Sequence, residues 1–197
     1  MSKYFILILS LIIINMSTFS QGISVDLSGG VSIPTSKFKD SINTGFGGTL
    51  RIGYMLSNDL TITGKSGYLY FPGQTKTIED GTMKTSIGVI PILFGVKYFP
   101  PFLNQVFSDE KMRFYGGAEV GVFLFRYKQN KNLTRLGDKK VINNENWPGF
   151  SPSFGLQYKF FDGLYIGYDF NYYYVGIEGI PTSWFGGEIN FQYDFKF

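Results

Sequence analysis

Apolar and polar residues alternate one by one along most of this chain, and that alternation limits the elements it can form. The final segment, NFQYDFKF, is the clearest case. A period of two places successive side chains on opposite faces of a β-strand, whereas a helix requires a period of 3.6 residues. No helical period follows Gln21, so the sequence predicts an all-β fold. The apolar positions of the last segment are Phe191, Tyr193, Phe195 and Phe197.

Eight segments carry this pattern, and clusters of Gly, Pro, Asn, Asp and Ser separate them, as expected for turns. Pro91 lies inside the fourth segment and has no N–H to donate, so we expect a β-bulge there. Eight strands joined in chain order predict an antiparallel up-and-down barrel. The predicted strands cover 23–33, 46–54, 60–71, 85–99, 112–127, 149–160, 164–175 and 183–197, with long polar loops at 34–45, 72–83 and 128–147, a connection at 100–111, a loop at 176–182 and short turns at 56–59 and 161–163.

Alternation alone does not say which face of the barrel points outward, because a soluble lipocalin-like barrel that carries a hydrophobic ligand also has eight strands. The apolar face is layered, with Ile52 and Val120 at mid-strand and aromatic residues such as Tyr98 and Phe150 near the strand ends. An aliphatic band between two aromatic girdles is typical of a lipid-facing surface. The opposite face is mostly small and polar, as a crowded interior requires. We therefore predict a transmembrane barrel, with the soluble barrel as the alternative.

The first twenty residues differ in composition from the rest of the chain. Lys3 precedes an apolar run from Tyr4 to Ile14, and small residues follow as far as Ser20. This order is typical of a secretory signal peptide, and the run is short for a membrane-spanning helix. We predict a signal peptide at 1–20 and one barrel domain at 21–197, and a membrane anchor is the less favoured alternative.

Several classes of function are disfavoured by residue types that the sequence lacks. The 197 residues include no cysteine and no histidine, which removes the commonest metal ligands and the commonest general base at neutral pH. We therefore predict a non-enzymatic protein with no catalytic, cofactor-binding or metal site. The formal net charge of +3 is too small to indicate a nucleic-acid partner.

A few charged residues fall on the inward face of the predicted barrel. The interior of an eight-stranded barrel is just wide enough for side chains to fill it. We therefore expect these charges to form a structural, salt-bridged plug, and a narrow channel is the alternative. The predicted interior charge cluster consists of Arg51, Lys65, Arg113, Glu119, Asp169 and Glu188.

Three segments resemble strands of a known family: FQYDFKF at the end, IPILFGVKYF at 90–99 and RFYGGAEVGVFLF at 113–125. The family is that of the small outer-membrane β-barrel proteins of Gram-negative bacteria, such as the transmembrane domain of outer-membrane protein A and outer-membrane protein X. The resemblance covers the whole mature chain and implies the outer membrane as location, with its lipids and lipopolysaccharide as partners. It also implies that Phe191, Tyr193, Phe195 and Phe197 form the signal that the barrel-assembly machinery reads.

The resemblance says little about function. Small barrels that are enzymes, such as the lipid A palmitoyltransferase, depend on a histidine that this chain lacks. We predict a structural or interaction role through the extracellular loops, with extracellular or envelope proteins as candidate partners. The 128–147 loop could contact lipopolysaccharide phosphates, although a solvated loop is the favoured interpretation. Its cations are Lys128, Lys131, Arg135, Lys139 and Lys140, and Trp147 and Trp184 are expected at the rim or in loop packing.

Overall fold

The computed structural model describes residues 22–78, 81–106, 111–133, 137–177 and 180–197, so the expected signal peptide lies outside the described residues. Most of the described chain is antiparallel strand, with a short 3₁₀ helix η2 (Ser36–Asp40) and a short helix α2 (Pro101–Val106). The strands are β1 (Gly22–Thr35), β2 (Gly45–Met55), β3 (Leu60–Phe71), β4 (Thr75–Ile78), β5 (Gly81–Tyr98), β6 (Met112–Leu133), β7 (Gly137–Phe161), β8 (Leu164–Ile177) and β9 (Ile180–Lys196).

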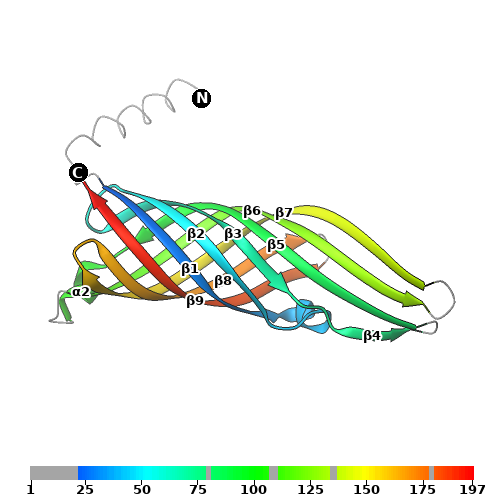
Figure 1. The fold of residues 1–197 in the computed structure, drawn as a ribbon. Helices are drawn as coiled ribbons and strands as arrows, with labels where there is room; N and C mark the ends of the chain where they lie inside the picture. The colour runs from blue at the N-terminus through cyan, green and yellow to red at the C-terminus, as the bar shows by residue number, and fades with distance from the viewer. Residues whose placement is uncertain (1–21, 79–80, 107–110, 134–136, 178–179) are drawn as a thin grey trace, which may run out of the picture.

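Eight of these strands close into a barrel (Figure 1). Strand β3 pairs directly with β5, and β1 pairs with β9 from Gly22–Lys196 to Thr35–Ser183. The short β4 lies outside the ring and pairs with β5 alone. Closure satisfies the backbone groups of the first and last strands, which an open sheet would leave unpaired in lipid. The predicted eight-stranded antiparallel up-and-down barrel is confirmed, with one additional strand beside it.

The two faces of the wall have opposite character. On β1, Asp26 is 1% exposed whereas its neighbour Leu27 is 61% exposed, and on β6 the same holds for Glu119 (3%) and Val120 (62%). At these positions the apolar side chains therefore point outward and the charged ones point inward. A lipocalin-like carrier requires the reverse, so that alternative is wrong. Aromatic pairs on neighbouring strands mark the outward rim, namely Phe46–Tyr70, Phe150–Tyr174 and Tyr172–Phe185.

The two ends of the barrel differ in how far the strands project from them. At one end, called here the short-turn end, lie the 56–59 turn, the Asp162–Gly163 turn, helix α2 and the free ends of β1 and β9. The positive φ of Gly163, 80°, closes the tight hairpin there. At the other end, the long-loop end, β5, β6 and β7 continue well beyond the other strands with β4 alongside (Figure 1). One side of the barrel wall is therefore much taller than the other.

Two segments of this tall side were predicted to be long loops, and both predictions are wrong. Most of the 128–147 segment is strand rather than loop, because β6 and β7 stay paired from Tyr127–Asn143 to Leu133–Gly137. Likewise, the 72–83 segment contains β4 and the start of β5, paired from Thr75–Lys84 to Ile78–Gly81. Outside the membrane neither face of a strand must be apolar, so the period of two disappears from the sequence while the backbone ladder continues. The 100–111 connection contains α2, and the 176–182 loop is mostly the paired ends of β8 and β9.

The predicted bulge at Pro91 is also wrong. Pro91 pairs in register with Phe123 of β6, between Ile90–Leu124 and Ile92–Val122. On the β3 side the pairing skips two positions of β5 and resumes without a register shift. The missing N–H therefore interrupts one ladder locally instead of inserting a residue. A shift occurs elsewhere, between Lys159 and Phe161 of β7.

Candidate functional site

Arg51 of β2 is the centre of a buried ion-pair network in the short-turn half of the barrel interior. Its Nη1 donates to Asp26 Oδ2 and to Asp169 Oδ2, each at 3.0 Å. Its Nε donates to Glu119 Oε1, also at 3.0 Å. The four side chains are 3% exposed or less. Carboxylates from β1, β6 and β8 thus converge on one guanidinium and tie distant parts of the wall together.

Two further buried cations form ion pairs beside this network or with it. Lys65 Nζ lies 3.5 Å from Glu188 Oε2 and donates to the hydroxyl of Tyr173 at 2.7 Å, and that hydroxyl donates to Glu188 Oε1 at 2.9 Å. Lys97 Nζ lies 3.1 Å from Asp26 Oδ2 and 4.3 Å from the centre of the Tyr115 ring. Buried charges are tolerable only when they are paired in this way.

The structure places five of the six predicted cluster residues in the buried interior, in two neighbouring groups: Arg51 with Glu119 and Asp169, and Lys65 with Glu188. Arg113 lies at the edge of the charged interior, where its side chain remains 20% exposed. There it pairs with Asp194 at 3.1 Å and lies 3.4 Å from the centre of the Tyr165 ring.

Sequence reasoning missed three members of the network, Asp26, Lys97 and Asp194. Each lies between two apolar residues that point outward. The one-by-one alternation that placed the other six residues inside therefore places these three inside as well. Among the described residues the interior then holds four cations and five carboxylates. This near balance is what a closed, ion-paired interior requires.

Above the charged network, toward the long-loop end, the barrel interior is apolar. Trp184 of β9 is fully buried there and packs against the rings of Phe71 and Phe123, each at 5.6 Å between centroids. Tyr173 stacks on Trp184 at 5.1 Å while its hydroxyl reaches Glu188 below. The expectation of a small, polar interior is therefore wrong for this half. Trp184 is not at the rim, and Trp147 is partly buried and packs against this layer.

Helix η2 closes this apolar layer from above. Phe38 points from η2 into the barrel, 5.4 Å from the Phe71 ring and 5.9 Å from Trp184. Ile42, just after the helix, is 1% exposed and its backbone bridges to Gly73. The first long connection thus folds back over the interior instead of extending into solvent.

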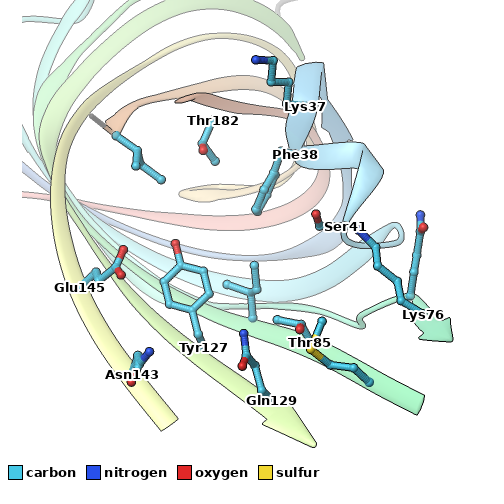
Figure 2. A pocket seen from close by; sticks show the side chains of 14 residues that line it. Lys37, Phe38, Ser41, Lys76, Thr85, Tyr127, Gln129, Asn143, Glu145 and Thr182 are labelled. Atoms are coloured by element: carbon cyan, nitrogen blue, oxygen red, sulfur yellow. The ribbon is translucent and has the colours of Figure 1, made fainter. Parts of the chain in front are cut away.

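A pocket of about 600 Å³ lies between η2 and the inner face of the tall wall formed by β5, β6 and β7. Figure 2 shows Phe38 and Tyr127 facing into it from opposite sides. Its floor is apolar, with Ile87 and Ile177 beside Phe38, whereas its rim is polar. The charged rim residues are Lys37 on η2, Lys76 on β4 and Glu145 on β7.

Tyr127 is half-buried in this pocket, called here the mouth pocket, whereas the charged residues at its rim are exposed. Burial, and secondarily the carboxylate of Glu145, raise the pKa of Tyr127 to about 12. The phenol therefore stays neutral at physiological pH and can donate a hydrogen bond to a bound molecule. Glu145 itself accepts a hydrogen bond from Trp147 Nε1 at 3.1 Å, which orients its carboxylate at the rim.

Three residues of the predicted assembly signal lie on β9, and the fourth, Phe197, follows it directly. Phe191, Tyr193 and Phe195 face outward and are 43–53% exposed. Strand β9 ends at Lys196, one residue before the predicted end, and the Phe197 side chain beyond it is 88% exposed. These aromatic rings thus form a stripe on the strand that closes the barrel.

The described residues contain no group of three or more Asp or Glu side chains placed to hold a metal ion. Within the same part of the chain, no helix combines the length and apolar character needed to cross a membrane.

The closed ring, the outward apolar band and the buried ion pairs together define a transmembrane β-barrel. Residues 6–197 match the model of the family described as the outer membrane protein beta-barrel domain. The chain therefore belongs to this family and is located in the outer membrane of a Gram-negative bacterium. By the usual orientation of such barrels, the short-turn end faces the periplasm and the long-loop end faces the exterior. A search of curated proteins gave no match.

Solved structures of small outer-membrane barrels share this fold. The outer membrane protein OprG from Pseudomonas aeruginosa superposes with a TM-score of 0.56 at 13% identity, covering 90% of this chain and 97% of that one. Neisserial surface protein A gives 0.50 at 16% identity with the same coverage. The outer membrane protease OmpT from Escherichia coli gives 0.51 at 8% identity, covering 92% and 100%. At these identities the similarity concerns the fold alone.

Proposed function

We propose that this protein is an interaction protein of the outer membrane, with a closed interior and a binding surface at its extracellular mouth. The proposal rests on one observation: two successive layers of side chains fill the barrel interior. An ion-paired layer around Arg51 is followed by an aromatic layer around Trp184, and Phe38 covers the second layer. An ion would have to disrupt both layers to cross, so a channel is disfavoured.

The mouth, in contrast, is built to receive another molecule. The tall wall of β5, β6 and β7 and helix η2 enclose the pocket, and its floor and rim differ in polarity. Lys37 and Lys76 supply positive charge and Glu145 supplies negative charge around apolar side chains. Such a surface suits an amphipathic segment with charges of both signs, for example a loop of an extracellular or envelope protein.

We infer that the protein is not an enzyme. The sequence supplies no histidine or cysteine, and the buried carboxylates are engaged by Arg51, Lys65 and Lys97. A carboxylate held by a cation in this way is a poor general base. The similarity to OmpT concerns the fold alone and does not indicate that this chain is a protease.

Site-specific photocrosslinking on intact cells tests the mouth as the binding surface. A photoreactive residue at Gln129 would face the pocket, and one at the adjacent Asn130 would face the outside of the same strand. We expect Gln129 to capture a discrete partner that Asn130 does not capture, with mass spectrometry identifying it. Equal capture at both positions, or none at Gln129, would refute the proposal.

Planar-bilayer recordings of the purified protein test the closed interior separately. We expect no stable single-channel steps, because two layers of side chains fill the interior. Large, reproducible steps in the unmodified protein would replace this proposal with the narrow channel.

A further inference from the structure

The outer surface of the tall wall has a hollow centred on Gly88 of β5. Gly88 pairs with Tyr70 of β3 on one side and with Arg126 of β6 on the other. Because Gly88 has no side chain, a space of about 270 Å³ remains between these neighbours. The Tyr68 hydroxyl leans over it, since a Cβ at Gly88 would lie 2.6 Å from that oxygen. The remaining lining residues are Ser86, Lys128 and Ile142.

Two cations border the hollow without an anion beside them. Arg126 and Lys128 are two residues apart on the outward face of β6, so their Cα atoms are about 7 Å apart. Their partners on β7 are Asn144 and Ile142, and on β5 Gly88 and Ser86, all uncharged. Among the described residues neither cation takes part in an ion pair. The site therefore offers unneutralised positive charge together with hydroxyl donors.

The position of the hollow along the barrel axis indicates which part of the membrane lies beside it. Along the same outward face, Ile90 and its β6 partner Leu124 lie next toward the membrane, and Val122 follows; Ile90 and Val122 are 39% and 41% exposed. The outward aromatic rim is at this level too, through Phe46 and Tyr70. Polar headgroups of the outer leaflet lie directly above such a rim. In the Gram-negative outer membrane that leaflet consists of a phosphorylated glycolipid.

We propose that the hollow binds a phosphate of lipopolysaccharide, with the acyl chains of that lipid lying against Ile90 and Val122. The guanidinium of Arg126 suits bidentate binding of phosphate oxygens, and Lys128 adds a second charge. The Tyr68 hydroxyl and Ser86 complete the set of donors. This site lies on the outside of the wall and does not depend on the proposed function of the mouth.

Binding of purified lipopolysaccharide to the detergent-solubilised protein, measured by native mass spectrometry, tests the site. We expect the double variant Arg126→Ala, Lys128→Ala to weaken binding by about tenfold or more, since it removes charge-assisted contacts. The control, Lys39→Ala with Lys196→Ala, removes the same charge from exposed positions elsewhere and should bind like the parent. Equal losses in both double variants would show that binding follows net charge alone and would overturn the proposal.

The variant Gly88→Leu tests the shape of the site while keeping both cations. The leucine side chain fills the hollow. The atom nearest to it is the hydroxyl at the end of the Tyr68 side chain, which can move aside. We expect weaker lipopolysaccharide binding with unchanged heat-modifiable migration on gels, which reports a folded barrel. Undiminished binding by this variant would contradict a phosphate site at Gly88.

The identity of the ligand is tested with two further probes. Enzymatically dephosphorylated lipopolysaccharide should bind no better to the parent than to the Arg126→Ala, Lys128→Ala variant. Inorganic phosphate alone should compete poorly, because it lacks the acyl chains. Tight binding of the dephosphorylated lipid, or of inorganic phosphate alone, would refute the assignment to a lipopolysaccharide phosphate.

Discussion

Arg51 and Ile52 are consecutive residues of β2, yet their exposed fractions are 2% and 54%. The single-residue alternation of environment lets one thin wall satisfy lipid on one side and charge pairing on the other. Arg51 matters most on the inner side, because three carboxylates contact its guanidinium. Among the described residues, Glu119 and Asp169 have no other ion-pair partner, whereas Asp26 also pairs with Lys97.

We expect Arg51→Met to lower the free energy of unfolding by about 3–5 kcal/mol, the cost of leaving buried charges without their partner. The control Val120→Ala shortens a lipid-facing side chain and should have a much smaller effect. Urea unfolding in lipid vesicles, followed by tryptophan fluorescence, measures both. Equal stability of the two variants would show that Asp26, Glu119 and Asp169 are well compensated without Arg51.

Every strand of this barrel has a membrane part, and β5, β6 and β7 also have an extracellular part. Strand β7 has 25 residues, whereas β2 has 11. The outward positions of the membrane part are apolar, and those of the extracellular part include Arg126, Lys128 and Asn144. One strand therefore changes its pattern where it leaves the membrane, although its pairing continues without interruption.

This division predicts opposite results for two similar substitutions. Ile52→Arg places a charge in the apolar band and should cost about 2–4 kcal/mol. Ile142→Arg places the same side chain on the outward face of the extracellular part of β7, where water is available, and should cost little. The same unfolding assay compares them. A tolerated Ile52→Arg, or a water-accessible spin label at Ile52, would mean that the register of β2 is shifted by one residue.

At the scale of the whole molecule, the pairing of β1 with β9 decides whether a barrel exists. Fourteen residue pairs, from Gly22–Lys196 to Thr35–Ser183, join the two ends of the described chain. The outward aromatic stripe of β9 lies at this closure. We propose, from the family resemblance, that the assembly machinery reads this stripe, including Phe197.

Deletion of Phe197 should therefore reduce the amount of assembled barrel while leaving export from the cytoplasm intact. Heat-modifiable migration of outer-membrane fractions measures the assembled form, and blotting of periplasmic fractions detects the remainder. Phe161→Ala is a suitable control, because Phe161 is an exposed ring at the same end of the barrel. Unchanged assembly without Phe197 would make it an ordinary exposed residue.

The sequence by itself determined the membrane part of this protein. Lipid requires an apolar outward face and a barrel interior requires the opposite, so a period of two appears wherever a strand crosses the membrane. That period predicted the number of barrel strands, the outward position of Ile52 and the inward position of Arg51. It also placed Asp26, Lys97 and Asp194 inside, although they were not included in the predicted cluster.

The tertiary structure decided the features that depend on strands far apart in the chain. Arg51 meets Asp169 across 118 positions, and no local pattern specifies which of several inward carboxylates it pairs with. Trp184 enters the apolar layer because Phe38, Phe71 and Phe123 reach it from η2, β3 and β6. The extracellular wall and the hollow at Gly88 were likewise invisible in the sequence, because strands surrounded by water carry no obligatory alternation and a hollow exists only once its neighbours are paired.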